Sequence, residues 1–128
     1  VAFTADSLMA GGCGRLFEGT PEQMHASFEK MAHWPDDTQI CSGHEYTTAN
    51  LAFAVTVDPE NPTLRQRIQD TQTARSTGNF TVPSLMGLER ATNPYLRPSD
   101  TGLRAALSMT NATDAEVFRE VRTRKDRF

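Results

Sequence analysis

The pattern of apolar and polar positions divides the chain into two parts. Residues 1–57 alternate short, β-prone apolar runs with amphipathic segments, whereas residues 58–128 consist of polar, helix-prone segments separated by turn signals. Asp58-Pro59-Glu60-Asn61-Pro62 has the composition of a turn or linker and marks the boundary. The pattern therefore predicts an α/β fragment followed by an all-helical part.

The first part is expected to run strand–loop–helix–strand–loop–helix. These elements are predicted at about 1–4, 21–33, 38–42 and 47–57. The first helix has the strongest start signal, because Thr20-Pro21-Glu22-Gln23 combines an N-cap, a proline at the first helical position and a glutamine three residues after the cap. Thr47 or Thr48 is expected to cap the second helix. Two strands cannot bury one face of a sheet alone, so this part is expected to be the end of a larger sandwich.

The second part is expected to contain four helices. They are predicted at about 63–76, 84–91, 100–109 and from 114 onward. An extended stretch at 79–83 separates the first two. Thr113-Asp114-Ala115-Glu116 is a capping box that opens the last helix, whose apolar face points inward.

Composition and charge narrow the classes of function. The 128 residues are 38% hydrophobic and 23% charged, and no apolar run approaches the roughly 20 residues of a membrane span, so no membrane role is expected. A net charge of −3 argues against nucleic acid as a partner. Two cysteines are too few for a disulfide scaffold, which favours a reduced, cytoplasmic setting. Because Val1 begins directly in a strand-like run, we expect a piece of a longer protein. Whether a targeting segment precedes Val1 in that protein stays open.

Asp6 and His44 are the candidate metal ligands. Taken alone, Asp6 could be a turn former and His44 a structural histidine, but they occupy equivalent places after two successive strands, where metal sites of layered α/β folds are assembled. His25 and His33 fall on the first helix at a spacing that gives no helical metal pair, so both are interpreted as structural or solvated.

The glycine-rich segment Gly11-Gly12-Cys13-Gly14-Arg15 is predicted to be a loop whose backbone can approach another group closely. It has neither the phosphate-loop spacing nor the dinucleotide fingerprint. Cys13 and Cys41 form no C-x-x-C pair, and neither has an activating histidine in sequence, so no catalytic thiol is expected.

The C-terminal segment is basic. Five cations fall within nine residues: Arg119, Arg122, Arg124, Lys125 and Arg127. One interpretation is a solvated helix face that interacts with its own C-terminal dipole. The other is an anion site, because Arg122 and Lys125 are three residues apart, share a helix face and could clamp a carboxylate.

Several motifs, in order along the whole chain, resemble one family. The segments that carry the resemblance are Thr4-Ala5-Asp6-Ser7-Leu8, Gly11-Gly12-Cys13-Gly14-Arg15-Leu16-Phe17-Glu18-Gly19-Thr20, Ser42-Gly43-His44-Glu45-Tyr46-Thr47, Asn93-Pro94-Tyr95-Leu96-Arg97 and Val121-Arg122-Thr123-Arg124-Lys125-Asp126-Arg127-Phe128. They resemble glyoxalase II, hydroxyacylglutathione hydrolase, a family of the metallo-β-lactamase-fold hydrolases.

The resemblance implies an α+β fold, with the C-terminal end of an αββα sandwich over 1–57 followed by a small all-helical, glutathione-binding domain over 58–128. It implies hydrolysis of S-D-lactoylglutathione and related glutathione thioesters to glutathione and a 2-hydroxy acid, as in methylglyoxal detoxification. The reaction would use a metal-bound hydroxide at a binuclear centre of zinc, with iron or manganese as alternatives. The implied partners are the substrate and the N-terminal half of the sandwich.

The resemblance also assigns roles to individual residues. Asp6 matches the carboxylate that bridges the metals and His44 a metal ligand, so both would act in catalysis through the metal. The residues that match glutathione-binding positions are Arg15, Phe17, Tyr46 and the pair Arg122 and Lys125, which would grip the glycine carboxylate. Phe17 stands where many members carry tyrosine. The T-H-x-H-x-D-H motif that supplies the other metal ligands is absent from these 128 residues, so the chain alone is expected to be inactive.

Two alternatives stay open. A mononuclear-iron persulfide dioxygenase shares the sandwich and the Asp6 and His44 positions, although such enzymes generally lack the helical extension. A non-catalytic glutathione-binding module is the other alternative.

Overall fold

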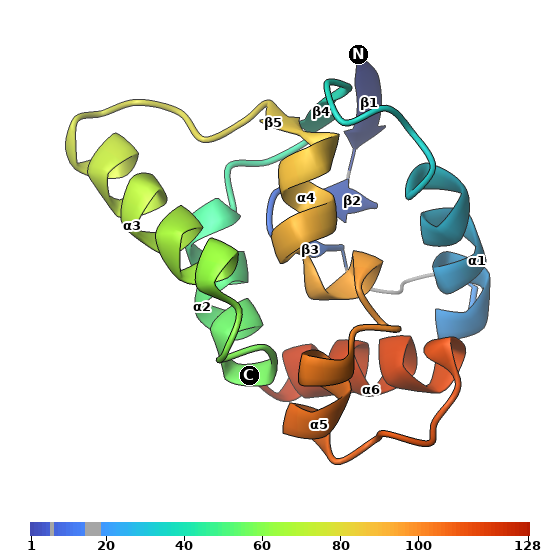
Figure 1. The fold of residues 1–128 in the computed structure, drawn as a ribbon. Helices are drawn as coiled ribbons and strands as arrows, with labels where there is room; N and C mark the ends of the chain where they lie inside the picture. Colours follow the sequence, from blue (N-terminus) through green and yellow to red (C-terminus); the bar gives the residue numbers. More distant parts are fainter. Residues whose placement is uncertain (6, 15–18) are drawn as a thin grey trace.

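A computed structural model describes residues 1–5, 7–14 and 19–128, which form a small α+β domain (Figure 1). The strands of the described residues are β1 (Ala2–Ala5), β2 (Leu8–Met9), β3 (Gly12–Cys13), β4 (Gln39–Ser42) and β5 (Ser84–Leu85). The helices are α1 (Pro21–Met31), α2 (Thr47–Val57), α3 (Pro62–Ser76), α4 (Met86–Thr92), α5 (Thr101–Leu107), α6 (Asp114–Arg127) and the 3₁₀ turn η1 (Pro94–Leu96). None of the helices in these ranges is long and apolar enough to cross a membrane.

A three-stranded sheet holds the two predicted strands side by side. Its order is β1-β4-β5, with β1 parallel to β4 and β5 antiparallel to it. Phe3 pairs with Cys41, and Ala5 pairs with Ser42. Because parallel strands end at the same edge of a sheet, β1 and β4 deliver the segments that follow them to one side of the molecule.

The glycine-rich segment is not wholly a loop, as the sequence predicted, because Gly12–Cys13 forms β3 and pairs antiparallel with β2. Gly11 adopts a φ of 76°, which glycine tolerates, at the turn between the two strands. A Cβ on Gly12 would lie 2.9 Å from Cγ of Asn50, and one on Gly11 would lie 2.7 Å from a methyl carbon of Leu51. The predicted close approach of the backbone is therefore confirmed, and its partner is α2.

Both predicted capping boxes are confirmed. The Thr20 hydroxyl accepts from the Gln23 N–H at 3.2 Å and the Gln23 side chain accepts from the Thr20 N–H at 3.0 Å, and Thr113 and Glu116 repeat this exchange. The predicted cap of α2 is wrong, because its N-cap is Tyr46 without a side-chain bond. The Thr47 hydroxyl instead lies 2.6 Å from the Thr81 hydroxyl, so the tertiary structure engages the group that would have capped the helix.

The second part also departs from the sequence prediction at two points. Ser84 and Leu85 form β5 and extend the sheet, although the sequence predicts a helix there. The helix α3 begins one residue early, because the Asn61 side chain accepts from the N–H groups of Thr63 and Leu64 at 3.1 and 3.2 Å. A side-chain cap at this position satisfies two of the otherwise unpaired N–H groups of the first turn.

The core joins residues from both sides of the predicted boundary at 57/58. Phe28 of α1 packs edge-on against Tyr95 and Phe118, with ring centroids 6.4 and 5.4 Å away. Helix α6 packs against α1, and α3 lies along α2 (Figure 1). The division into domains of 1–57 and 58–128 stays a prediction.

Candidate functional site

A pocket of about 610 Å³ opens where the end of α6 meets the β2–β3 hairpin and the loop after β4. Its lining residues are Met9, Cys13, Gly14, His44, Tyr46, Ala49, Asn50, Arg122, Lys125, Asp126 and Phe128. Four residues singled out from the sequence, His44, Tyr46, Arg122 and Lys125, therefore share one pocket.

His44 and Tyr46 form a flat wall at the mouth of this pocket. Both side chains are exposed, and their rings stack with centroids 4.8 Å apart and planes 2° from parallel. The Ser42 hydroxyl donates to the His44 carbonyl at 3.2 Å, which holds the chain as it leaves β4. The arrangement presents an accessible imidazole beside an aromatic face.

Glu45, between these two rings, turns the other way. Its Oε1 accepts from the N–H of Thr81 at 3.0 Å and also from the Thr81 hydroxyl, while its Oε2 is buried without a hydrogen bond among the described residues. These bonds tie the loop after β4 to the segment before β5. The sequence analysis missed this anchor, since its partner lies 36 residues away.

Lys125 provides the positive charge of the pocket wall. Its half-buried side chain places Nζ 5.5 Å from the ring centroid of Phe53 and 5.4 Å from that of Phe128. Cation–π contacts of this kind orient an ammonium group without neutralising it. The ammonium group of Lys125 is therefore positioned at the pocket wall by two aromatic rings.

Arg122 is held by the protein itself. Its side chain is only 3% exposed, and Nη1 donates to the carbonyls of Cys13 and Gly14 at 3.1 and 3.0 Å. Nη2 donates to Asp126 at 2.8 Å. The guanidinium thus ties α6 to β3, and its predicted role as a clamp for a substrate carboxylate stays a prediction.

Burial raises the pKa of the Cys13 thiol from 9.0 to about 11, although the nearby Arg122 opposes the shift. Burial lowers the pKa of Arg122, but Tyr95, Cys13 and Asp126 outweigh it, so the net shift is upward. At neutral pH the pocket floor therefore holds a neutral thiol beside a cation. A buried, protonated thiol is a poor nucleophile, in keeping with the expectation that Cys13 is not catalytic.

The remaining predicted site residues, Asp6, Arg15 and Phe17, lie outside the described residues, and their roles stay predictions. The structure describes Ala5, the residue before Asp6, paired with Ser42, two positions before His44.

Comparison with known proteins identifies the family. Residues 45–128 match the family model described as "Hydroxyacylglutathione hydrolase C-terminus". The chain is 58% identical to the hydroxyacylglutathione hydrolase of Ruegeria pomeroyi over 98% of its length, and 55% identical to that of Rhizobium meliloti over 98%. The chain belongs to the hydroxyacylglutathione hydrolase family.

The match covers only part of each hydroxyacylglutathione hydrolase. The chain spans about half the length of the curated relatives it matches, 49% for the two proteins above and 50% for that of Bartonella quintana. By the description of the family model, residues 45–128 correspond to the C-terminus of the proteins that carry this name.

The largest feature that the sequence did not predict is a buried polar hub. It consists of Glu89 with Arg67, Ser84, Thr92 and Asn93. Glu89 is fully buried, and its Oε2 accepts from Arg67 and Ser84 at 2.6 Å each. Its Oε1 accepts from the N–H of Gly11 at 2.9 Å and lies 3.1 Å from the Asn93 amide nitrogen. The hub therefore fixes the hairpin that forms one wall of the pocket.

Only one member of the hub carried a sequence signal. Asn93 opens the Asn-Pro-aromatic motif, and its amide nitrogen lies within 3.2 Å of the carbonyls of Met9 and Gly12, as donor to the hairpin. Its Oδ1 accepts from the N–H of Tyr95 at 3.0 Å and starts η1. Arg67 and Glu89 lie in locally polar helices, where nothing in the neighbouring residues signals burial.

Proposed function

We propose that this chain forms the glutathione-binding part of a hydrolase that cleaves S-D-lactoylglutathione and related glutathione thioesters to glutathione and a 2-hydroxy acid. The observation that carries the proposal is the pocket that gathers an accessible imidazole, an aromatic face and a cation. The names of the relatives support the same reaction.

The pocket chemistry suits glutathione, which carries carboxylates at its ends and a sulfur in the middle. Lys125 would bind a carboxylate, and the fixed charge of Arg122 would add to the positive potential behind it. The ring of Tyr46 would pack against the thioester region next to His44. Binding at the remote carboxylate would hold the reacting carbonyl in place beside the imidazole.

The residues present fit part of a metal centre. The exposed imidazole of His44 is a suitable ligand for zinc, iron or manganese, and Asp6 would add a carboxylate by resemblance to the family. A two-metal centre of this kind supplies an activated water at neutral pH. Two ligands are too few for it, so the N-terminal half of an αββα sandwich would provide the rest.

The sheet offers a place for that half. The strand β1 lies at the edge of its sheet, with Val1 and Phe3 exposed by 76% and 85%. An edge strand with exposed apolar residues is suited to pairing with a further strand. We place the rest of the sandwich on this edge.

The test is the exchange Lys125→Ala in the full-length protein. Losing a charged hydrogen bond of about 1.5–3 kcal/mol should raise KM for S-D-lactoylglutathione about ten-fold or more, with a much smaller change in kcat. The matched control is Arg124→Ala, because Arg124 is an exposed cation on the same helix that pairs with Glu120. An unchanged KM in the Lys125 variant would refute this assignment.

A further inference from the structure

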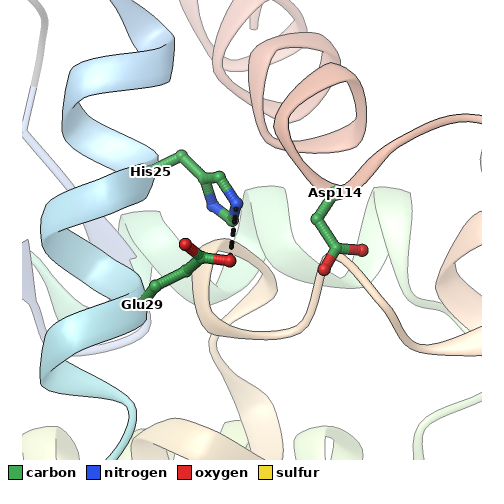
Figure 2. A group of neighbouring side chains, drawn as sticks. All are labelled: His25, Glu29 and Asp114. Carbon is green, nitrogen blue, oxygen red and sulfur yellow. Dashed lines mark ion pairs between the residues drawn. The ribbon is translucent and has the colours of Figure 1, made fainter.

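Three metal-ligating side chains from two helices meet on a face that the proposed reaction does not use. His25 and Glu29 lie one turn apart on α1, and Asp114 is the first residue of α6 (Figure 2). One ligand atom from each lies within 4.8 Å of the other two, and Nε2 of His25 is 3.3 Å from Oε1 of Glu29. With zinc–ligand bonds of about 2.0–2.2 Å, tetrahedral donors stand roughly 3.3 Å apart, so small side-chain rotations close the remaining gap.

The environment of His25 is unusual for a structural histidine. The residue is 7% exposed and its ring lies 5.4 Å from that of Phe118. Its Nδ1 is buried and makes no hydrogen bond among the described residues, and Nε2 has Glu29 as its polar partner. A buried polar ring with so little compensation is destabilising unless a ligand engages it.

The cluster opens onto a cavity of about 500 Å³, lined by His25, Glu29 and Asp114 together with Lys30 and His33. This space leaves room for water on the coordination positions that the three side chains do not fill. Arg104 donates to Oδ1 of Asp114 at 2.5 Å. A carboxylate has a second oxygen, so this bond fixes the side chain without exhausting its capacity as a ligand.

We infer that His25, Glu29 and Asp114 form a binding site for one divalent cation, with zinc favoured by the mixed imidazole and carboxylate donors. The site is separate from the pocket of the proposed function. Asp114 begins α6 and Lys125 lies eleven positions later, which places them about 16 Å apart along the helix. The cation would join α1 to α6 and thereby stabilise the folded chain.

The test is a zinc titration of the 128-residue chain, followed by NMR of the imidazole nitrogens and by thermal unfolding. The chain has three histidines, so each ring can be assigned separately. We expect the His25 signals to shift at stoichiometric zinc while those of His33 do not, and we expect Tm to rise because zinc binds the folded state. Unmoved His25 signals would overturn the proposal.

Variants give the second readout. His25→Ala and Glu29→Gln should each weaken zinc binding at least ten-fold, whereas His33→Ala, just beyond the end of α1 and in the same cavity, should bind as the parent does. Glu29 is 60% exposed, so its exchange keeps the test valid if the His25 variant fails to fold. In His44→Ala the zinc-induced shift of His25 should persist. Its loss there would place the zinc at the pocket and overturn the proposal, independently of whether the thioester is hydrolysed.

Discussion

The hub around Glu89 and the pocket around His44 use similar polar groups in opposite ways. In the hub, the carboxylate of Glu89 is fully buried and its two oxygens together meet Arg67, Ser84, Asn93 and the Gly11 N–H. In the pocket, His44 and Tyr46 are exposed, and the ammonium group of Lys125 lies over the rings of Phe53 and Phe128. The buried charge of Glu89 holds the fold, whereas the pocket places its imidazole and its aromatic ring where solvent reaches them.

Arg122 combines the two roles, because it is a buried cation with structural hydrogen bonds and also lines the pocket. Its side chain lines the pocket, yet its nitrogens bond to Cys13, Gly14 and Asp126. The same cation therefore supports the pocket wall and contributes to its potential. The following experiments separate the hub, which is complete within this chain, from the pocket, which we expect to need further residues.

The largest expected effect is on the rate of thioester hydrolysis, because the pocket of this chain is expected to need further residues. We expect the 128-residue chain to unfold cooperatively, yet to hydrolyse S-D-lactoylglutathione more than about 10³-fold more slowly than the full-length protein, because it lacks most ligands of the proposed metal centre. The measurement is a thioesterase assay on both proteins during titration with zinc. Turnover near the full-length rate at stoichiometric metal would show that the pocket is already complete.

Within the chain, the hub should be the most sensitive point. Glu89→Ala leaves Arg67 buried without its carboxylate and should lower the free energy of unfolding by about 3–5 kcal/mol. Urea denaturation followed by circular dichroism measures this loss. The control is Glu60→Ala, which removes an exposed pair at 4.0 Å from Arg65 and should cost less than about 1 kcal/mol. Similar losses of unfolding free energy in both variants would contradict the contrast between the buried hub and exposed ion pairs.

Arg122→Met should have an intermediate effect. It removes the donors to the carbonyls of Cys13 and Gly14, so we expect a loss of about 2–3 kcal/mol in the free energy of unfolding. Arg124→Met, on the exposed side of the same helix, is the control and should stay within about 0.5 kcal/mol. If both variants are equally stable, the hydrogen bonds of Arg122 do not stabilise the fold, and its role is confined to the pocket.

The pH dependence of stability should reveal the buried thiol of Cys13. Its pKa is raised from 9.0 to about 11, so the unfolded chain loses this proton first and stability falls as the pH rises through this window. The contribution is fully present below pH 9 and amounts to something on the order of 2 kcal/mol. Unfolding curves at several pH values should show that Cys13→Ala loses this slope. Cys41→Ala is the control and should keep it.

The sequence predicted most of the local structure, because the signals for it are local. Thr20 and Gln23 lie three residues apart, and their capping box starts α1 where the sequence placed it. Thr47 failed as a cap because its hydroxyl meets Thr81, far along the chain. Ser84 lies in β5 rather than in a helix because it pairs with Ile40. The residues around Ser84 give no sign of this distant partner.

The site was predictable to the extent that motifs mark it. Tyr46 came from the family resemblance alone, whereas His44 was also marked by its place after a strand and Arg122 and Lys125 by their shared helix face. The structure places all four on one pocket. The inward anchoring of Arg122 was not predictable, because nothing in the run of five cations distinguishes the one that meets the distant carbonyls of Cys13 and Gly14. The spacing of His25 and His33 indicates no metal pair on the helix. The cluster of His25 with Glu29 and Asp114 could not be recognised from the sequence, because Asp114 lies 89 positions after His25.

The hairpin of β2 and β3 depends on residues that the ribosome produces much later. Gly11 bonds to Glu89, 78 positions on, and the carbonyl of Cys13 bonds to Arg122, 109 positions on. At a synthesis rate of roughly 5–20 residues per second, Cys13 waits about 5–20 s for this partner. This wall of the pocket therefore completes its hydrogen bonds only after the last helix has been synthesised.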